Sequence, residues 1–535
     1  MRHHHVVSLA IFFSTTAAFA QIAPDARPKV IYTPIVLTGQ SAPGGGAFSA
    51  FPYHSFIDDA NQIVFLGATD GNTHTPNGIF LATPTGNQLV AKAGAPAPGL
   101  ADGVQISGFD INYHRVNTAG QVTFEGYLAG PGIDSTGDDN TNAGSNWIWS
   151  NGQLQLIAQF QTPAPGTNAL FRTFDRTTLN DLGQVAFRGV LTGPSVTAAN
   201  DSASWMGAPG DLQILAREGN PAPGGLVYGD MQGFDYPVLS PKGKVAFLAN
   251  VAGGNDPFNN RAFFAGTPGN LELVAHSGDA APGTNSTFHD IHGGWNTPRI
   301  NDNGQVIFVS TLNDGTRGIW SGKAGQLQLV ARTEDPAPGL SGATYDFFFD
   351  LGLNARGDIA FRADVKPTDD EAFAIYGGRP NHPDLIAASG QHAPGTEEGV
   401  LFGYLTDPVI NKDGQVAFFG YLTGENSRGP NDYGIFATGH NGDLRLIARF
   451  GDDFEVAPGD IRTIQALSHA GVFGTHILTF NAESNLVFLA KFTDGSEGIF
   501  TATVLPEPAT FALLVPLTLL LRRRRFPSMV KSLNR

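Results

Sequence analysis

Residues 179–187 read LNDLGQVAF, and close variants of this phrase return along the whole chain. The phrase occurs eight times and closes each time on a phenylalanine: Phe65, Phe124, Phe187, Phe247, Phe308, Phe361, Phe418 and Phe488. A second phrase that ends in APG alternates with it, and successive APG glycines are 55 to 67 residues apart. A period of about 58 residues indicates an array in which one supersecondary unit is reused.

Each repeat has the same internal order. An aromatic-rich stretch leads into an N-x-x-G turn, and a GQVAF-like strand, a variable loop, a short aromatic strand and an L-x-L-V-A-R strand follow. Four short strands per repeat predict the blade of a β-propeller. Within the turn, Asn180 is expected to form an Asx turn, and Gly183 is expected to adopt the positive φ that other residues resist.

The two ends of the array complement each other. The last repeat stops after GIF at 498–500 and lacks its fourth strand, whereas residues 31–39 are a lone strand of that type with no repeat before it. We therefore predict an all-β fold: an eight-bladed β-propeller of four-stranded blades, in which the N-terminal strand completes the last blade and closes the ring. Closure removes exposed sheet edges, which are prone to aggregation.

Three other architectures fit less well. An outer-membrane barrel needs strands of about 9 to 11 residues, and the strands expected here are nearer five. A β-solenoid would have a much shorter period. Separate small sandwich domains stay open as an alternative, although units below about 60 residues are marginal alone without disulfides.

Composition limits the chemistry and the partners. The 535 residues contain no cysteine, which excludes disulfides, thiolate metal sites and a cysteine nucleophile. The formal net charge is −16. Part of the positive charge that offsets the acids lies in the cluster of four arginines near the C-terminus, residues 522–525. A strongly acidic chain repels nucleic acid and anionic lipid, so cations and neutral glycans are the more suitable ligands.

Both termini read as targeting segments. Residues 1–20 have a basic start, an apolar run and an Ala-Phe-Ala ending, which is typical of a secretory signal peptide. The propeller repeat domain is expected over residues 21–503. Residues 504–525 carry an apolar run that ends in four arginines, which favours a membrane segment with the arginines on the cytoplasmic side. Residues 526–535 form a basic tail.

The C-terminal segment resembles the PEP-CTERM sorting signal of Gram-negative bacteria. The resemblance rests on the Pro-Glu-Pro tripeptide, the apolar run and the arginine cluster: Pro506, Glu507, Pro508, Arg522, Arg523, Arg524 and Arg525. It implies an exosortase-type processing enzyme as a partner and a chain exported to the cell envelope or surface, anchored at least transiently by its C-terminal segment. A simple C-terminal anchor is the alternative. The paired N-x-x-G and APG phrases also resemble bacterial tandem-repeat surface proteins whose repeat domain has no known function.

Loop lengths indicate which end of each blade carries recognition. The distance from the GQVAF phenylalanine to the next strand's aromatic residue ranges from 12 to 25 residues, whereas the following turn hardly varies. The variable loops and the blade-to-blade connections are expected at one end, opposite the N-x-x-G turns, where variation does not disturb the scaffold. The longest loop, 129–146, holds candidate Ca²⁺ ligands, although an ordinary solvated loop is the alternative: Asp134, Asp138, Asp139 and Asn140.

Two further sets of residues are site candidates. Aspartates recur on the first strand of five repeats, and if they point inward they would make a cation or sugar site; otherwise they merely end the strand: Asp110, Asp175, Asp235, Asp350 and Asp407. Weak catalytic candidates cluster in one repeat only: His289, Asp290 and His292. Three aromatic residues near the variable loops either stack on sugars or belong to the core: Tyr127, Trp147 and Trp149.

These patterns favour an exported, envelope- or surface-anchored propeller that binds or scaffolds extracellular material, with polysaccharide as the expected ligand. One alternative is a propeller enzyme, a glycan hydrolase or lyase. Another is a structural surface-layer component that self-associates without a ligand. No G-x-S-x-G, H-E-x-x-H or phosphate-loop motif is present to favour a specific reaction.

Overall fold

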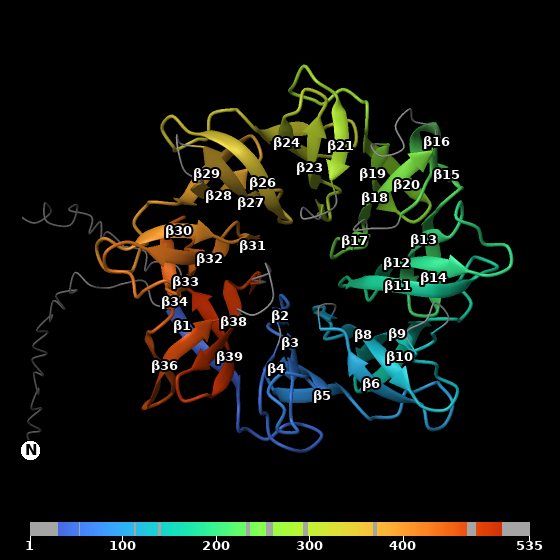
Figure 1. Ribbon diagram of the computed structural model, residues 1–535, viewed down its shortest axis with the longest axis horizontal. Helices are drawn as coiled ribbons and strands as arrows, with labels where there is room; N and C mark the ends of the chain where they lie inside the picture. The colour runs from blue at the N-terminus through green and yellow to red at the C-terminus, as the bar shows by residue number, and fades with distance from the viewer. Residues whose placement is uncertain are drawn as a thin grey trace, which may run out of the picture.

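The computed structural model describes residues 30–505, apart from residues 53, 112–113, 137–140, 232–235, 253–259, 293–297, 367–371 and 468–477. The described residues form eight small antiparallel sheets arranged in a ring (Figure 1). This confirms the predicted eight-bladed β-propeller. The one helical element among the described residues is a single 3-10 turn, η1 (Pro223–Gly225).

The first four blades follow the chain in order. Blade 1 contains β2 (Ser55–Ile57), β3 (Ile63–Gly67), β4 (Gly78–Thr83) and β5 (Gly86–Lys92). Blade 2 contains β6 (Gln105–Phe109), β7 (Arg115–Val116), β8 (Val122–Ala129), β9 (Gly144–Ser150) and β10 (Gln153–Gln159). Blade 3 contains β11 (Leu170–Leu179), β12 (Val185–Thr192), β13 (Ser202–Ala208) and β14 (Asp211–Arg217). Blade 4 contains β15 (Pro221–Ala222), β16 (Leu226–Tyr228), β17 (Val238–Leu239), β18 (Val245–Ala252), β19 (Arg261–Thr267) and β20 (Asn270–His276).

The second half repeats this plan. Blade 5 contains β21 (Phe288–His292), β22 (Arg299–Ile300), β23 (Val306–Leu312), β24 (Arg317–Gly322) and β25 (Gln328–Arg332). Blade 6 contains β26 (Thr344–Leu353), β27 (Ile359–Lys366), β28 (Ala372–Arg379) and β29 (His382–Ala388). Blade 7 contains β30 (Leu401–Leu405), β31 (Val409–Ile410), β32 (Val416–Thr423), β33 (Tyr433–Thr438) and β34 (Leu444–Arg449). Blade 8 contains β35 (Asp453–Ala457), β36 (Asp460–Leu467), β37 (Thr479–Phe480), β38 (Asn485–Phe492) and β39 (Glu497–Val504).

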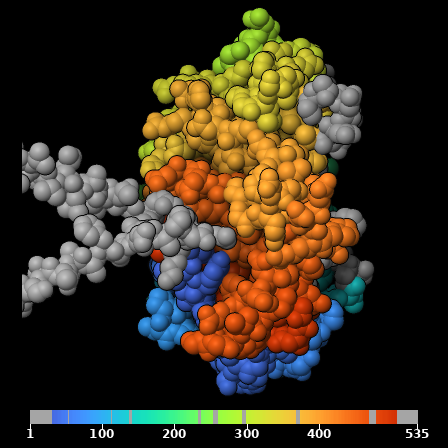
Figure 2. Space-filling view, turned by 90° about the vertical axis from the view of Figure 1, so that its left-hand side faces the viewer, coloured from blue at the N-terminus to red at the C-terminus, as the bar shows by residue number. Residues whose placement is uncertain are grey.

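The N-terminal strand closes the ring. β1 (Val30–Leu37) pairs antiparallel with β39, from Val30 opposite Val504 to Leu37 opposite Gly498. Figure 2 shows the blue start of the ring packed beside the orange and red end of the chain. Pro34 lies at a register shift in β1, which is the outermost strand of blade 8, where a missing N–H donor costs little. The predicted closure is confirmed.

Each blade is packed around one aromatic pair. The phenylalanine of the GQVAF-like strand lies directly opposite an aromatic residue of the next strand, as with Phe361 and Tyr376, whose stacked rings are 5.3 Å apart. Such cross-strand aromatic pairs are the contacts that stabilise a sheet most. In blade 2 the partner of Phe124 is Trp147, and Trp149 lies opposite Val122. Both tryptophans are buried and belong to the core, so neither is available to stack on a sugar.

The N-x-x-G turn forms as the sequence predicts. Oδ1 of Asn180 accepts hydrogen bonds from the backbone N–H groups of Leu182 (3.0 Å) and Gln184 (2.9 Å). Gly183 has a φ of 74°. In the two blades that flank the closure, Asn61 and Ser484 occupy the glycine position and adopt a φ of 60°. Small polar residues tolerate this conformation better than bulky ones.

The same turns also join the blades to one another, which the sequence does not show. In five blades the asparagine Nδ2 donates to a backbone carbonyl of the next turn: Asn117 to Asn180 (2.8 Å), Asn301 to Asn354 (3.1 Å), Asn354 to Asn411 (3.0 Å), Asn411 to Asn481 (3.2 Å) and Asn481 to Asp58 (2.8 Å). The other three links are Gln62 Nε2 to Thr118 O (3.3 Å), Asp181 N to Pro241 O (3.1 Å) and Lys242 N to Asp302 Oδ1 (2.7 Å). A closed circle of hydrogen bonds therefore runs through all eight turns.

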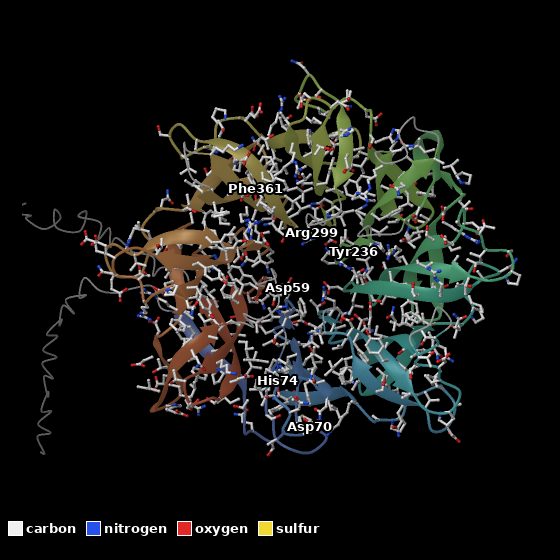
Figure 3. All side chains as sticks on the ribbon, in the orientation of Figure 1. Asp59, Asp70, His74, Tyr236, Arg299 and Phe361 are labelled. Atoms are coloured by element: carbon white, nitrogen blue, oxygen red, sulfur yellow. The ribbon has the colours of Figure 1, made fainter. Side chains whose placement is uncertain are left out.

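This circle surrounds the middle of the ring. Asp59, in the turn of blade 1, lies near the centre in Figure 3, whereas Asp70, in the loop after the second strand, lies nearer the rim. The variable loops and the post-APG connections meet at the other end of each blade, as expected. In blade 7, for example, Asn426 Nδ2 donates to the backbone carbonyl of Glu398 at 2.6 Å.

Asp58 takes the place of the turn asparagine in blade 1, and replacing it is expected to stabilise the protein. Burial raises the pKa of Asp58 to about 6, although hydrogen bonds from Gln62 and Ala60 act in the opposite direction. The folded state prefers the protonated Asp58 carboxyl. The stability that this protonated carboxyl contributes is therefore complete below the pKa that Asp58 has in the unfolded chain, and it is lost as the pH rises through about 6. We expect Asp58→Asn to raise the free energy of unfolding at pH 7 by up to about 3 kcal/mol.

The gain should shrink toward pH 4, where the wild-type carboxyl is protonated, and thermal unfolding at both pH values measures it. The reciprocal variant Asn411→Asp serves as the control. Asn411 is buried and donates through Nδ2 to Asn481, so a carboxylate there should destabilise the ring, increasingly as the pH rises. A gain from Asp58→Asn that is equal at both pH values would contradict this explanation.

Candidate functional site

Two of the five predicted aspartates come together at the boundary of blades 6 and 7. Asp350 and Asp407 each lie four residues before the asparagine of their turn, Asn354 and Asn411. Since these two turns are joined by a hydrogen bond of 3.0 Å, the segments that lead into them also approach closely. The spacing within the repeat therefore places two carboxyl groups side by side.

Local backbone geometry helps to bring the pair together. A register shift in β26 falls between Phe349 and Leu351, on either side of Asp350. Such a β-bulge re-aims a side chain relative to the regular alternation of a strand. Asp407 lies in the short segment between β30 and β31, next to the buried Thr406.

The Asp350 carboxyl lies close enough to Asp407 to act on its charge. Burial, followed by the Asp350 carboxyl, raises the pKa of Asp407 to about 8, and Arg362 acts against this shift. Two adjacent carboxylates cannot both ionise easily, because each disfavours the charge of the other. At neutral pH the Asp407 carboxyl is therefore largely protonated.

Arg362 is the cation of the site. Its Nη1 lies 3.4 Å from Asp407 Oδ1 and donates to the backbone carbonyl of Leu405 at 3.3 Å. The guanidinium carbon lies 4.0 Å from the ring centre of Phe349, and Nη1 also donates to the hydroxyl of Tyr404. Only 6% of the side chain is exposed. Arg362 thus fixes the boundary of the two blades through stacking and hydrogen bonds.

The site is open to solvent on one side. Tyr404 is 40% exposed, and its ring meets Phe373 edge to face at 4.8 Å, which limits its motion. The Asp407 side chain is 27% exposed. Asp364, on β27, adds a third acid close enough to raise the pKa of Asp407. We define the blade 6–7 site as Asp350, Arg362, Asp364, Tyr404 and Asp407.

Two polar groups of this site have unused hydrogen-bonding capacity. Arg362 Nε and Asp407 Oδ1 are buried, and neither has a hydrogen-bond partner among the described residues. Buried polar groups normally have partners, so a donor and an acceptor that are both unfilled in one place are unusual. Unfilled hydrogen-bonding groups beside an exposed aromatic ring are suited to a ligand that carries hydroxyl or amino groups.

The other predicted aspartates give less information. Asp110 lies in blade 2, where burial comes first, followed by its charge and that of Glu125, in raising the pKa of Tyr127. The backbone of Asp175 lies in β11 opposite Arg188, but its side chain is outside the described part of the chain, as is Asp235. Among the described side chains, Asp350 and Asp407 are the members of the predicted acidic set that act on each other.

Asp134 is the described member of the candidate calcium loop, and it holds a local turn. Asp134 Oδ1 accepts from the backbone N–H (3.0 Å) and hydroxyl (2.8 Å) of Thr136. Asp314 in blade 5 makes the same turn with Thr316, so this carboxylate shapes a loop. Asp138, Asp139 and Asn140 lie outside the described residues. Within the part that is described, no group of three or more His, Cys, Asp or Glu side chains could hold a metal ion.

Of the catalytic candidates of blade 5, Asp290 has a described side-chain contact. Asp290 Oδ1 lies 4.0 Å from Nη1 of Arg261, and its backbone N–H donates to the Thr311 hydroxyl at 3.1 Å. This arrangement joins blade 4 to blade 5. His289 precedes Asp290 on β21, and the side chain of His292 is not among those described.

Arg362 and Tyr404 were missed by the sequence reasoning, although a signal for the arginine exists. The residue after the GQVAF phenylalanine is apolar in five blades, but it is charged at three positions: Glu125, Arg188 and Arg362. Arg188 makes the equivalent contact to the next blade, donating from Nη1 to the carbonyl of Met231 at 3.0 Å. A charge at this otherwise apolar position marks a blade boundary with polar contacts.

The terminal predictions fall outside the described residues. This holds for residues 1–20 and for the whole predicted sorting motif: Pro506, Glu507, Pro508, Arg522, Arg523, Arg524 and Arg525. From Val30 to Leu505, gaps excepted, no helix has the length and apolar character needed to cross a bilayer.

Comparison with solved structures finds propeller proteins at very low identity. An oligogalacturonate lyase in complex with manganese is 12% identical, with a TM-score of 0.37 over 90% of this chain and 99% of that one. The WD40 domain of SCAP from fission yeast is 8% identical, with a TM-score of 0.38 over 89% and 98% of the two chains. The polysaccharide lyase Uly1 is 9% identical, with a TM-score of 0.33 over 77% and 94%. Likeness at this level carries no argument about activity.

No curated protein matches the chain. A family model does, over residues 33–317 and 313–512, which together span nearly all of the propeller. The chain therefore belongs to DUF7453, a family of unknown function.

Proposed function

We propose that this protein is an exported, envelope- or surface-anchored propeller that binds extracellular polysaccharide through the blade 6–7 site. The observation that carries the proposal is the exposed ring of Tyr404 beside the buried Arg362 guanidinium and the partly exposed Asp407 carboxyl. Sugars are commonly bound by an aromatic face together with a few fixed polar groups. The signal-like start and the Pro-Glu-Pro segment support export and anchoring.

Replacing the exposed tyrosine is expected to weaken binding about tenfold, which corresponds to about 1.4 kcal/mol of lost stacking. The mature chain from Gln21, kept in mild detergent, is titrated calorimetrically with a panel of neutral, acidic and amino-sugar polysaccharides. Tyr404→Ala removes the ring, and Tyr404→Phe keeps it.

Tyr127→Ala is the matched control, because Tyr127 is 50% exposed but lies in blade 2. We expect this variant and Tyr404→Phe to stay within about threefold of the wild type, since neither removes the Tyr404 ring. Loss of binding in Tyr127→Ala but not in Tyr404→Ala would move the site to blade 2. If the wild type bound none of the polysaccharides, the proposal would be contradicted. Released oligosaccharides would favour the enzyme.

A further inference from the structure

The boundary between blades 1 and 2 has the longest link in the circle of turns. Blade 1 has Asp58 where six other turns have an asparagine, so its turn residue has no amide that can donate to the next turn. Gln62 makes the link instead, and its Nε2 lies 3.3 Å from Thr118 O in an exposed position. The seven other links measure 2.7 to 3.2 Å. This boundary therefore depends more than the others on the side chains of its inner strands.

A fully buried histidine crosses the same boundary. His114, in the segment that leads into β7, is 0% exposed, and its Nε2 lies 3.0 Å from the backbone carbonyl oxygen of His54 in blade 1. Its ring meets Phe56 of β2 edge to face at 5.0 Å. The next residue, Arg115, places its guanidinium carbon 4.3 Å from the centre of the same phenylalanine ring. These contacts join the inner strands of the two blades.

The hydrogen bond to His54 determines where the proton of the histidine ring lies. A backbone carbonyl only accepts hydrogen bonds, so Nε2 of His114 carries the proton and Nδ1 is the bare nitrogen of a neutral ring. Nδ1 is buried and has no hydrogen-bond partner in the part of the chain that the structure describes. A second proton, on Nδ1, would therefore be a buried donor without an acceptor, which is unfavourable.

The charges around His114 also oppose a second proton. Burial, followed by the charge of Arg115 and to a smaller extent that of His54, lowers the pKa of His114 to about 3, although the hydrogen bond to the His54 carbonyl acts in the opposite direction. Both side chains whose charges act on the ring are therefore bases, and an imidazolium would be repelled by them.

The acids on the neighbouring elements have other partners. Asp58 and Asp59, which follow β2, accept hydrogen bonds within their own turn and from blade 8. In blade 2, Asp110 and Glu125 act on the Tyr127 hydroxyl. The remaining strand that packs beside β7 toward blade 1, β3 (Ile63–Gly67), has no titratable residue.

We propose that the blade 1–2 boundary is an acid-sensitive seam, at which protonation of His114 separates the two blades before the rest of the propeller unfolds. In the open seam the imidazolium is solvated by water, which satisfies the new donor and screens the repulsion from Arg115. No covalent bond forms or breaks, because the ring takes up one proton from solvent on opening and returns it on closing. The proposal goes beyond polysaccharide binding and does not depend on it.

The expected pH dependence follows from proton linkage. The closed seam prefers the neutral ring, whose pKa is lowered to about 3, whereas a solvated histidine has a pKa of about 6.5. The stability that the neutral ring contributes to the closed seam is complete above about pH 6.5 and is lost as the pH falls toward 3. Since one proton is taken up on opening, the opening equilibrium constant should rise about tenfold for each pH unit in this window.

A single introduced thiol can report the opening, because the chain contains no cysteine. Val64→Cys places the thiol on β3, where Val64 is fully buried in the core shared by blades 1 and 2. Ala417→Cys is the matched reporter at the boundary of blades 7 and 8, since Ala417 is also fully buried and also precedes the phenylalanine of its second strand. The labelling rate of each thiol in the mature chain is measured from pH 7 to pH 4 with a disulfide reagent that reacts in acid. The ratio of the two rates cancels the titration of the thiol itself.

We expect the ratio of the Val64→Cys rate to the Ala417→Cys rate to rise roughly a hundredfold from pH 6 to pH 4. Adding His114→Gln should limit this rise to less than about threefold, because the glutamine amide can still donate to the His54 carbonyl but takes up no proton. His382→Gln is the control, since the His382 side chain is 81% exposed and lies in blade 6. It should leave the hundredfold rise unchanged.

Three results would overturn the proposal. The first is a ratio that stays constant from pH 6 to pH 4, and the second is an equal rise in the presence of His114→Gln. The third is a parallel acceleration at both reporters, which would show that acid unfolds the whole ring at once. Thermal unfolding at pH 7 confirms that each variant is folded. If His114→Gln did not fold, the comparison of the two reporters in the presence of His114 would still decide whether the seam opens first.

Discussion

A chain that begins at residue 38 is expected to lose most of its stability, because it lacks β1. This strand supplies the outer edge of blade 8 and is paired with β39 from Val30 to Leu37. Its removal would expose Phe500, which is fully buried, and would leave the edge of β39 unpaired. We expect a loss of more than about 5 kcal/mol, comparable to the whole stability of many proteins, together with aggregation through the open edge.

Circular dichroism during heating and size-exclusion chromatography measure this effect. The control is a chain that begins at Val30, which keeps β1 complete and should unfold at the temperature of the chain that begins at Gln21. If the chain from residue 38 stayed monomeric with an unchanged melting temperature, the N-terminal strand would not be the closing element of the ring.

Gly183→Val is expected to produce the second large loss, about 3 kcal/mol. Gly183 has a φ of 74°, where a β-branched residue is strained by about 1 to 2 kcal/mol. A Cβ atom at this position would also lie 2.7 Å from Oε1 of Gln121, a side chain of blade 2. The substitution therefore disturbs both the turn and the contact between two blades.

Gly152→Val separates these two causes. Gly152 has a φ of 81°, and a Cβ atom there would have no atom within 4 Å. It should lose only the backbone part, about 1 to 2 kcal/mol. Chemical denaturation of both variants gives the difference. Equal losses at the two positions would show that the contact with Gln121 has no energetic role.

The fold was predictable to an unusual extent because the repeats average out local uncertainty. A turn such as Asn180–Gly183 is weak evidence once, but its return at a fixed period identifies a blade. The missing fourth strand of the last repeat predicted the partner of β1 by elimination. The strands are longer than the expected five residues, since β8, β12, β18 and β27 span eight each. Sequence patterns therefore identify the turns between strands more sharply than the residue at which two strands stop pairing.

The site was only partly predictable. Asp350 and Asp407 share one position within the repeat, so the sequence could present both as candidates. It could not separate them from Asp110, which occupies a similar position and lies in blade 2 with a different set of neighbours. Arg362 and Tyr404 belong to different blades, and their contact depends on how two blades pack.

The sequence by itself determined the number of blades, the conformation of the turns and the closure by the N-terminal strand. These features depend on local backbone preferences and on a pattern that is repeated within the chain. The tertiary structure alone decided which blade boundary carries the carboxyl pair, the buried guanidinium and the exposed tyrosine. It also turned the Nδ2 of five of the six turn asparagines toward the next blade. Such contacts join groups more than forty residues apart in the sequence, and neither periodicity nor propensity records the distance between them in space.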